Sequence, residues 1–362
     1  MKISIPKEVK NNEFRVAITP AGVHELIRFG HEVYIEKDAG LGSNIPDEQY
    51  EAEGAKIIDS ADKVWEIADM VLKVKEPIES EYHRLKEGLI LFTYLHLAAD
   101  KKLTAELMKK KVHAIAYETV EAKDGSLPLL APMSIVAGRL SAQVASYFLM
   151  KTQGGRGLLM GGVPGTQPAR VVVIGGGVAG ENAVSMAVGL HANVTVLDTN
   201  IQRLAELDYH YRGRIKTIVS NKLDLEKAMK EADVVIGAVL VKGAKAPKLV
   251  SNELVSQMHR GSVLVDIAID QGGCFEDSRP TTHEEPTFKV HESTFYCVAN
   301  MPGSVPRTST FALTNVTLPY IVELATNGME ALDKDPTLAA GLNVTEGKIV
   351  RKEIQEAHPE LH

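Results

Sequence analysis

Cysteine is scarce in this chain, and long apolar runs are missing. The 362 residues include two cysteines, Cys274 and Cys297, too few for a disulfide framework, so a reducing compartment is favoured. No apolar run approaches the roughly 20 residues of a membrane-spanning helix. The first 20 residues carry Lys, Glu and Arg and lack the apolar core of a signal peptide. We therefore expect a cytoplasmic protein without a membrane partner.

An excess of basic charge is also lacking. The chain has 40 Lys and Arg against 47 Asp and Glu, a formal net charge of −7. Nucleic acids and anionic membranes are bound by basic surfaces. The H-E-x-x-H sequence of zinc hydrolases and the G-x-S-x-G turn of serine hydrolases do not occur. We therefore predict neither nucleic-acid binding nor hydrolysis of these two kinds.

What is present is an alternation of strand-like and helix-like segments, typical of α/β proteins with parallel sheets. A chain of 362 residues is longer than a single hydrophobic core usually supports. We therefore predict two Rossmann-like, doubly wound domains with an active-site cleft between them. The first is discontinuous, residues 1–130 plus 306–362, and the second covers 131–305. Predicted strands lie at 2–6, 31–36, 55–58, 69–75, 89–96, 113–118, 171–174, 193–198, 215–219, 233–239, 262–268 and 294–298, and predicted helices at 20–29, 100–111, 132–150, 308–328 and 343–358.

Glycines mark the turn between a strand and a helix in VVVIGGGVAGENA, residues 171–183. A lone G-x-G-x-x-G is weak evidence, but this one follows an apolar strand and opens a helix, as a dinucleotide site requires. Gly175 permits the tight turn, Gly177 lets a pyrophosphate approach, and Gly180 lets the helix pack on the strand. With Val178 at the helix N-terminus, these are candidate cofactor residues. The plain alternative is a glycine-rich turn without a ligand.

A carboxylate ends the next predicted strand. Asp198 lies roughly 20 residues after Gly175, where an acid accepts hydrogen bonds from the adenosine ribose. The same acid would repel the 2′-phosphate of NADP, so we predict NAD as the cofactor and 131–305 as its domain. Arg203 either stacks on the adenine or neutralises a phosphate, and we favour stacking, because Asp198 would otherwise have no reason to lie there.

Polar residues also follow other predicted strands, at the end of the sheet where α/β proteins bind ligands. Arg15 lies in the turn after the first strand, and Asp270 follows the strand 262–268. Lys75 and His96 end the strands 69–75 and 89–96. Asp266 is the less suitable acid because it lies within a predicted strand.

Each of these residues has a chemical role to offer. The planar fork of Arg15 fits a substrate carboxylate, and Lys75 adds a positive charge or a donor to a carbonyl. Histidine is the side chain that suits proton transfer near neutral pH, which makes His96 a candidate acid or base. Asp270 could hold an ammonium group or orient a water molecule. Taken singly, each residue could also have no role in catalysis or binding. Arg15 could form an ion pair at the surface, for example, and Lys75 could extend from a strand end into solvent.

Long blocks of the chain resemble bacterial alanine dehydrogenases, which form one family with the α-subunits of transhydrogenases. The blocks are KISIPKEVKNNEFRVAITPAGV (2–23), LKVKEP (72–77), LFTYLHLA (91–98), SLPLLAPMS (126–134), TQGGRG (152–157), IGAVLVKGAKAPKLV (236–250), VDIAIDQGGCFE (265–276) and CVANMPGSVPRTST (297–310). They span most of the chain, so the resemblance is specific.

The resemblance implies oxidative deamination of L-alanine to pyruvate and ammonium with NAD+ as oxidant, by a homohexamer with a discontinuous substrate domain. Arg15 and Lys75 match the pyruvate-binding positions, and His96 and Asp270 match the catalytic pair. The positions that match NAD contacts are Ser134, Asp198, Arg203, Ser220, Val239, Leu240, Ile267, Asp270, Arg279, Val298, Ala299, Asn300 and Met301.

A metal site is the one point where the resemblance fails. Some relatives bind magnesium through an acid and a histidine of the late helix, and the matching positions here are Glu323 and Asn327. An amide is a poorer ligand than imidazole for many metals. We therefore predict no metal, with Glu323 as the one candidate ligand.

Two other functions compete with the dehydrogenase. A dinucleotide-binding subunit of a proton-translocating transhydrogenase shares this fold and a similar opening sequence, but it needs no amino-acid pocket. An NAD-sensing regulatory protein could have lost the polar residues, yet Arg15, Lys75, His96 and Asp270 are all present. The polar strand ends favour the dehydrogenase.

Overall fold

The computed structural model describes residues 1–239 and 246–361. The chain divides into two compact units, one of Met1–Met133 together with the segment from Gly303 onward, the other of Ser134–Pro302. Each unit contains one sheet with helices packed against it, which confirms the predicted α/β class with two Rossmann-like halves. None of the helices among the described residues combines the length and apolar content needed to cross a bilayer.

The first unit is built on a sheet of 8 strands. Six parallel strands have the order β3-β2-β1-β4-β5-β6, with β14 and β15 added antiparallel beyond β6. The elements are β1 (Lys2–Ile5), α1 (Pro20–Arg28), β2 (Glu32–Glu36), η1 (Leu41–Ser43), α2 (Asp47–Glu51), β3 (Lys56–Ile58), α3 (Ala61–Ile67), β4 (Met70–Leu72), η2 (Glu79–Arg84), β5 (Ile90–Thr93), η3 (Leu97–Ala99), α4 (Lys101–Lys109), β6 (His113–Ala116), η4 (Tyr117–Thr119), α10 (Pro306–Asn327), η8 (Gly328–Glu330), α11 (Ala331–Lys334), α12 (Pro336–Ala339), β14 (Leu342–Thr345), β15 (Lys348–Ile349) and α13 (Lys352–Ala357).

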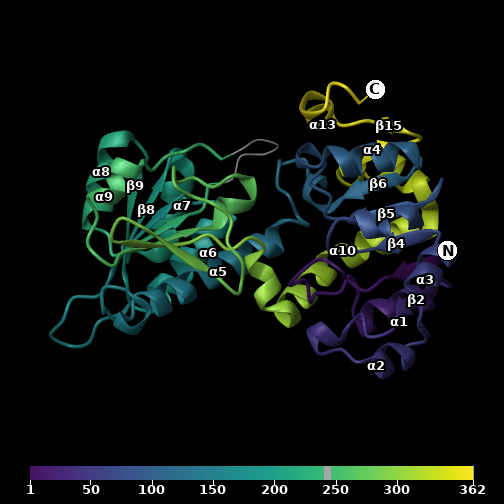
Figure 1. The fold of residues 1–362 in the computed structure, drawn as a ribbon, viewed down its shortest axis with the longest axis horizontal. Helices are drawn as coiled ribbons and strands as arrows, with labels where there is room; N and C mark the ends of the chain where they lie inside the picture. The colour runs from purple at the N-terminus through teal and green to yellow at the C-terminus, as the bar shows by residue number, and fades with distance from the viewer. Residues whose placement is uncertain (240–245, 362) are drawn as a thin grey trace. The chain divides into compact units, whose positions relative to one another are not determined.

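Both faces of this sheet are covered by helices. One buried cluster joins Trp65 of α3 and Leu107 of α4 to strand residues such as Leu91. On α1, Gly22 approaches Leu318 of α10, and Thr19 caps the helix by accepting from the backbone N–H of Gly22. The strands β4, β5 and β6 run side by side in this unit (Figure 1). Because the strand order reverses between β1 and β4, the expected binding position is beyond the carboxyl ends of these two strands.

The second unit has 7 strands in the order β12-β13-β11-β10-β7-β8-β9, all parallel except β12. This is the doubly wound order of dinucleotide-binding folds, with its reversal between β7 and β10. The elements are α5 (Ala131–Phe148), which begins in the first unit, η5 (Lys151–Gln153), β7 (Arg170–Ile174), α6 (Val178–Gly189), β8 (Asn193–Asp198), α7 (Ile201–Tyr211), β9 (Ile215–Val219), α8 (Lys222–Glu231), β10 (Val234–Gly237), α9 (Asn252–Ser256), β11 (Val263–Asp266), η6 (Ile267–Gln271), β12 (Thr287–Val290), β13 (Ser293–Tyr296) and η7 (Met301–Ser304), which ends in the first unit.

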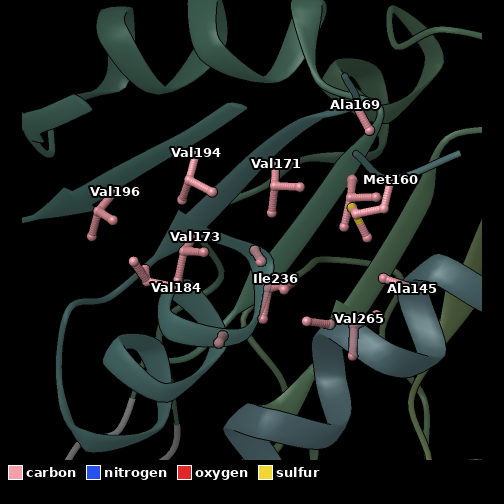
Figure 2. Packing of buried hydrophobic residues seen from close by; sticks show 14 of the residues in the cluster. Ala145, Met160, Ala169, Val171, Val173, Val184, Val194, Val196, Ile236 and Val265 are labelled. Carbon is pink, nitrogen blue, oxygen red and sulfur yellow. The ribbon is translucent and has the colours of Figure 1, made fainter. Parts of the chain in front are cut away.

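Alternating apolar residues of β7 face opposite sides of this sheet. Val171 and Val173 enter the cluster beneath α5, α6 and α7, and Figure 2 shows them beside Val184 and Val194. Val172 and Ile174 enter the cluster formed with α8 and α9. Figure 1 shows α5 and α6 away from α8 and α9 in this unit, as two covered faces require.

The prediction of a helix over 343–358 is wrong in its first half. There β14 and β15 form an antiparallel pair, and the helix is confined to α13. The turn between the strands holds Glu346 and Gly347 with φ of 49° and 79°, which suits a two-residue hairpin. Val344 is fully buried and β14 pairs with β6. Tertiary pairing thus overrides the weak helical pattern.

Candidate active site

Arg15 occupies the loop beyond β1 and is held by its near neighbour Glu13. Nε of Arg15 donates to Oε1 of Glu13 at 2.7 Å, and Nη2 donates to Oε2 at 2.5 Å. Nη1 lies 3.0 Å from Sδ of Met133. Both side chains of the pair are buried, at 2% and 0% exposure. Burial raises the pKa of Glu13, but the Arg15 guanidinium outweighs it and holds that pKa below the ordinary value.

A second buried charge cluster lies beyond β4, and sequence reasoning missed it. Nζ of Lys73 is 3.1 Å from carboxylate oxygens of both Glu8 and Glu81. Glu8 also accepts from the backbone N–H of Val74 at 2.6 Å. Burial raises the pKa of Glu8, with Lys73 opposing it. Lys73 was hidden within a predicted strand, whereas β4 ends at Leu72.

The placement of Lys75 at a strand end needs correction for the same reason. It lies three residues beyond β4, half-buried, and its backbone N–H donates to Glu8 at 3.4 Å. The ammonium group of Lys75 acts on the Glu13 carboxylate and lowers its pKa. The Glu13 carboxylate therefore interacts electrostatically with both predicted substrate-binding residues, Arg15 and Lys75.

His96 lies beyond β5, which ends at Thr93 rather than at His96 as predicted. Its backbone is left-handed, with φ of 51°, a conformation uncommon for residues other than glycine. Glu118 stabilises it by accepting from the backbone N–H of His96 at 2.6 Å and of Leu95 at 3.2 Å. Oε1 of Glu118 is also 3.8 Å from Nδ1 of the His96 ring, whose side chain is 45% exposed.

Tyr94 connects the histidine to the arginine. Its ring stacks on His96 with 6.1 Å between the ring centroids, and its hydroxyl donates to the Leu129 carbonyl at 2.6 Å. The positive charge of Arg15 acts electrostatically on the same hydroxyl. Burial raises the pKa of the Tyr94 hydroxyl well above its ordinary value. The first unit thus brings Arg15, Lys75 and His96 to one end of its sheet, through Glu13 and Tyr94.

The glycine turn of the second unit has the geometry predicted for a dinucleotide site. Gly175 has φ of 97°, and a Cβ on Gly180 would lie 1.8 Å from the Gly175 carbonyl oxygen. Those two glycines are therefore required by the fold. A Cβ on Gly177, by contrast, would meet nothing within 4 Å. Gly177 and the exposed Val178 open α6, so this turn leaves space for a phosphate at a helix N-terminus.

Asp198 ends β8 and faces this turn. Its Oδ2 accepts from the backbone N–H of Gly176 at 2.6 Å, and Oδ1 accepts from Asn200 at 2.8 Å. Nε of Arg203 donates to the Gly176 carbonyl at 2.6 Å, and its guanidinium also contacts Glu181 and Glu206. Both side chains thus contact the glycine turn at Gly176, and Arg203 is held in addition by Glu181 of α6 and Glu206 of its own helix.

Asp270 lies on the short helix η6 that follows β11, and its side chain is exposed. Asp266 is the last residue of β11 and not a mid-strand residue as predicted. It is fully buried, and burial raises its pKa. Ile267 packs at the edge of the core below α6. The catalytic candidate of this unit is therefore exposed, while its neighbouring acid is enclosed.

The remaining predicted cofactor residues of this unit fall on other loops at strand ends or on the first turn of α5. Ser220 donates its backbone N–H to the Asp198 carbonyl at 2.9 Å. Arg279 lies over the Phe288 ring at 4.2 Å. Leu240 is outside the described residues. Ser134 lies in α5, Val239 follows β10, and Val298, Ala299, Asn300 and Met301 follow β13.

The candidate metal ligand is engaged elsewhere. Oε1 of Glu323 accepts from the side-chain amide of Asn327 at 2.7 Å, and the Asn327 oxygen accepts from Lys334 at 2.8 Å. Within residues 1–239 and 246–361, no group of three His, Cys, Asp or Glu side chains has the arrangement of a metal site.

Two family models match the chain. The model "Alanine dehydrogenase/PNT, N-terminal domain" matches residues 4–137, and "Alanine dehydrogenase/PNT, C-terminal domain" matches residues 141–352. The chain is 61% identical to an alanine dehydrogenase of Mycolicibacterium smegmatis over 355 residues, 98% of this chain and 96% of the relative. It is 57% identical to an alanine dehydrogenase of Staphylococcus haemolyticus, covering 99% and 96%.

Solved structures agree with these matches. An L-alanine dehydrogenase superposes with a TM-score of 0.97 at 50% identity, covering 100% of both chains. A transhydrogenase from Sinorhizobium meliloti superposes with a TM-score of 0.81 at 24% identity, covering 97% and 99%, which shows a common fold alone. The chain thus belongs to the alanine dehydrogenase/PNT family.

Proposed function

We propose that this chain is an L-alanine dehydrogenase, which converts L-alanine, water and NAD+ to pyruvate, ammonium, NADH and a proton. The observation that supports this most is the 61% identity to an alanine dehydrogenase over 98% of the chain. Arg15, Lys75 and His96 lie at one end of the first sheet, and this supports substrate chemistry there. We accordingly assign substrate binding to the first unit and the dinucleotide to the second.

Arg15 and Lys75 are assigned to the substrate carboxylate. The pair of Arg15 and Glu13 fixes the guanidinium in place before any substrate arrives, so little side-chain entropy is lost on binding. The Nε–Nη2 edge of Arg15 already serves Glu13, so a substrate carboxylate meets other donors of the guanidinium. Lys75 adds a second positive charge close to Glu13.

NAD is the proposed cofactor, held by the turn Gly175–Gly180 and by Asp198. The space at Gly177 supports a pyrophosphate at the N-terminus of α6. The Asp198 carboxylate favours ribose hydroxyls over a 2′-phosphate. When bound, NAD+ accepts the hydride that leaves Cα of alanine. We further propose the homohexamer that the family resemblance implies, and a cytoplasmic location, which the scarcity of cysteine supports.

His96 and Asp270 are assigned to the proton transfers. Loss of hydride from Cα leaves an iminium group on the substrate, and addition of water gives a carbinolamine that collapses to pyruvate and ammonium. A base must take a proton from the water, and an acid must protonate the leaving nitrogen. His96 is partly exposed and positioned by Glu118, which suits it to exchange protons with substrate and solvent.

The assay is alanine-dependent formation of NADH by the purified chain, followed by absorbance, without membranes or other proteins. We expect turnover with L-alanine and NAD+, and the reverse reaction with pyruvate, ammonium and NADH. Hydride transfer between nucleotides without any need for alanine would instead support the transhydrogenase subunit. Dinucleotide binding without either reaction would support an NAD sensor.

A further inference from the structure

The segment 266–278, which carries Asp270, is folded around one buried carboxylate. Oδ1 of Asp266 accepts from the backbone N–H of Ala268 at 3.0 Å. Oδ2 accepts from the backbone N–H of Cys274 at 2.9 Å and from Oγ of Ser278 at 2.5 Å. Donors on both sides of Asp270 in the sequence therefore meet at the same carboxylate, and the residues between them form a closed loop.

The backbone of this loop follows the carboxylate closely. Gly273 has φ of 75°, and a Cβ there would lie 2.6 Å from Oδ2 of Asp266. Phe275 also points its backbone N–H at Oδ2, at 3.4 Å. A side chain at position 273 would displace the loop from the carboxylate.

Lys248 holds the same loop from outside. Its Nζ donates to the carbonyl of Gly272 at 2.6 Å and to the carbonyl of Phe275 at 2.8 Å. Asp266 thus binds N–H groups of the loop, while Lys248 binds carbonyl groups of it. Because Lys248 is exposed, its substitution removes two loop contacts without opening the core.

We propose that Asp266 and Lys248 are positioning residues, which together fix the loop that presents Asp270 and Ile267 for the reaction. This inference rests on the proposed function. Asp266 itself takes no part in proton transfer, since it is fully enclosed and surrounded by donors from its own loop. Because reacting groups displaced by about 1 Å can lose 10²-fold in rate, a loosened loop lowers kcat.

The first test is Asp266→Asn, with Asp233→Asn as the matched control. Asp233 is also a buried acid of this sheet, but it precedes β10, at the opposite end, where it accepts from the Arg170 N–H and pairs with Arg156, both at 2.8 Å. We expect Asp266→Asn to lower kcat by roughly 10–100-fold, with the KM for alanine changed less than threefold. Asp233→Asn should lower the Tm by a similar amount and leave kcat near the wild-type value.

Hydrogen–deuterium exchange gives a readout that is independent of activity. Peptides from 266–278 should exchange faster than in wild type in Asp266→Asn, and at the wild-type rate in Asp233→Asn. Inactivity of the wild type with alanine would overturn the proposed function, and loop exchange would still show whether Asp266 orders this segment. A folded Asp266→Asn protein with wild-type kcat, or with unchanged exchange, would overturn the positioning role.

A second variant decides the question if Asp266→Asn does not fold. Lys248→Met should lower kcat by about tenfold with an unchanged Tm, and Lys248→Arg, which retains donors for both carbonyls, should recover most of that loss. Equal kcat in wild type and Lys248→Met would show that the outer contacts do not position Asp270, and would overturn the proposal for Lys248.

Discussion

The candidate substrate site of the first unit is formed by buried charged side chains beyond the strands, whereas the candidate dinucleotide site of the second unit is formed mainly by backbone. Arg15, Glu13 and Lys73 are enclosed in ion pairs with 0–2% of their side chains exposed. The candidate dinucleotide site is instead a glycine turn at a helix start, bordered by Asp198. A small carboxylate needs concentrated charge in fixed positions, while a long dinucleotide needs backbone N–H groups and space. Substitutions of the buried charges of the first unit should therefore affect folding and substrate binding together, whereas a substitution at Gly177 should affect the cofactor alone.

His96 should show the largest effect, and it separates chemistry from folding within the first unit. Because its side chain is 45% exposed, His96→Ala should leave the Tm nearly unchanged while kcat falls by roughly 10²–10⁴, the usual value of a positioned acid or base. Steady-state rates across pH and a thermal melt measure both. Near-normal turnover at the pH optimum would remove His96 from the mechanism.

Arg15→Lys should weaken substrate binding and also destabilise the fold. Lysine keeps the charge but cannot replace the two bonds to Glu13, and disrupting a buried pair costs about 3 kcal/mol. We expect the KM for alanine to rise roughly tenfold or more, as for the loss of a charge-assisted hydrogen bond, with a lower free energy of unfolding in urea. Affinity for NADH should stay the same. If it falls instead, Arg15 belongs to the cofactor site.

Gly177→Ala tests the other half of the comparison. A Cβ at Gly177 contacts no protein atom within 4 Å, and the same holds at Gly189 in the last turn of α6. Gly177→Ala should weaken NADH binding about tenfold, equivalent to 1.4 kcal/mol, at an unchanged Tm. Gly189→Ala is the control and should change neither affinity nor activity. Equal affinities in the two variants would mean that no phosphate approaches Gly177.

Asp198→Ala should change cofactor choice more than activity. Removing the carboxylate deletes ribose acceptors and a repulsion toward the 2′-phosphate of NADP. The ratio of kcat/KM for NADP to that for NAD should rise several-fold at saturating alanine. Arg203 is already bound to Gly176, Glu181 and Glu206, so Arg203→Ala in addition should not cancel the gain. An unchanged ratio in Asp198→Ala would place discrimination elsewhere.

The smallest effect concerns the pH dependence of stability. Burial disfavours the Glu13 carboxylate, but Arg15 holds its pKa below the ordinary value of 4.5. A lowered folded-state pKa gives stability that is present above pH 4.5 and is lost as the pH falls through the folded-state value. The free energy of unfolding should therefore fall less steeply with acidification in Glu13→Gln than in wild type. Parallel curves from urea titrations at pH 6 down to 3.5 would contradict this.

Much of the fold was predictable because its signals are local. The strand, glycine turn and helix around Gly175 are set by apolar runs and by the lack of a Cβ, within a dozen residues. The strand limits near Lys75 and His96 were not predictable, since carboxylates from distant segments take over the backbone N–H groups there. Glu8 lies 66 residues from Val74, and Glu118 lies 22 from His96.

The sequence by itself determined the alternation of elements, the dinucleotide motif with its acid, and the polar residues beyond the strands. Only the tertiary structure decided which charges are paired. It joined Lys73 to Glu8 and Glu81, bound Arg15 to Glu13, made a hairpin of the predicted tail helix, and enclosed Asp266 within the loop of Asp270. Periodicity reports which face of an element is buried, but the partner of a buried charge depends on contacts between segments far apart in the chain.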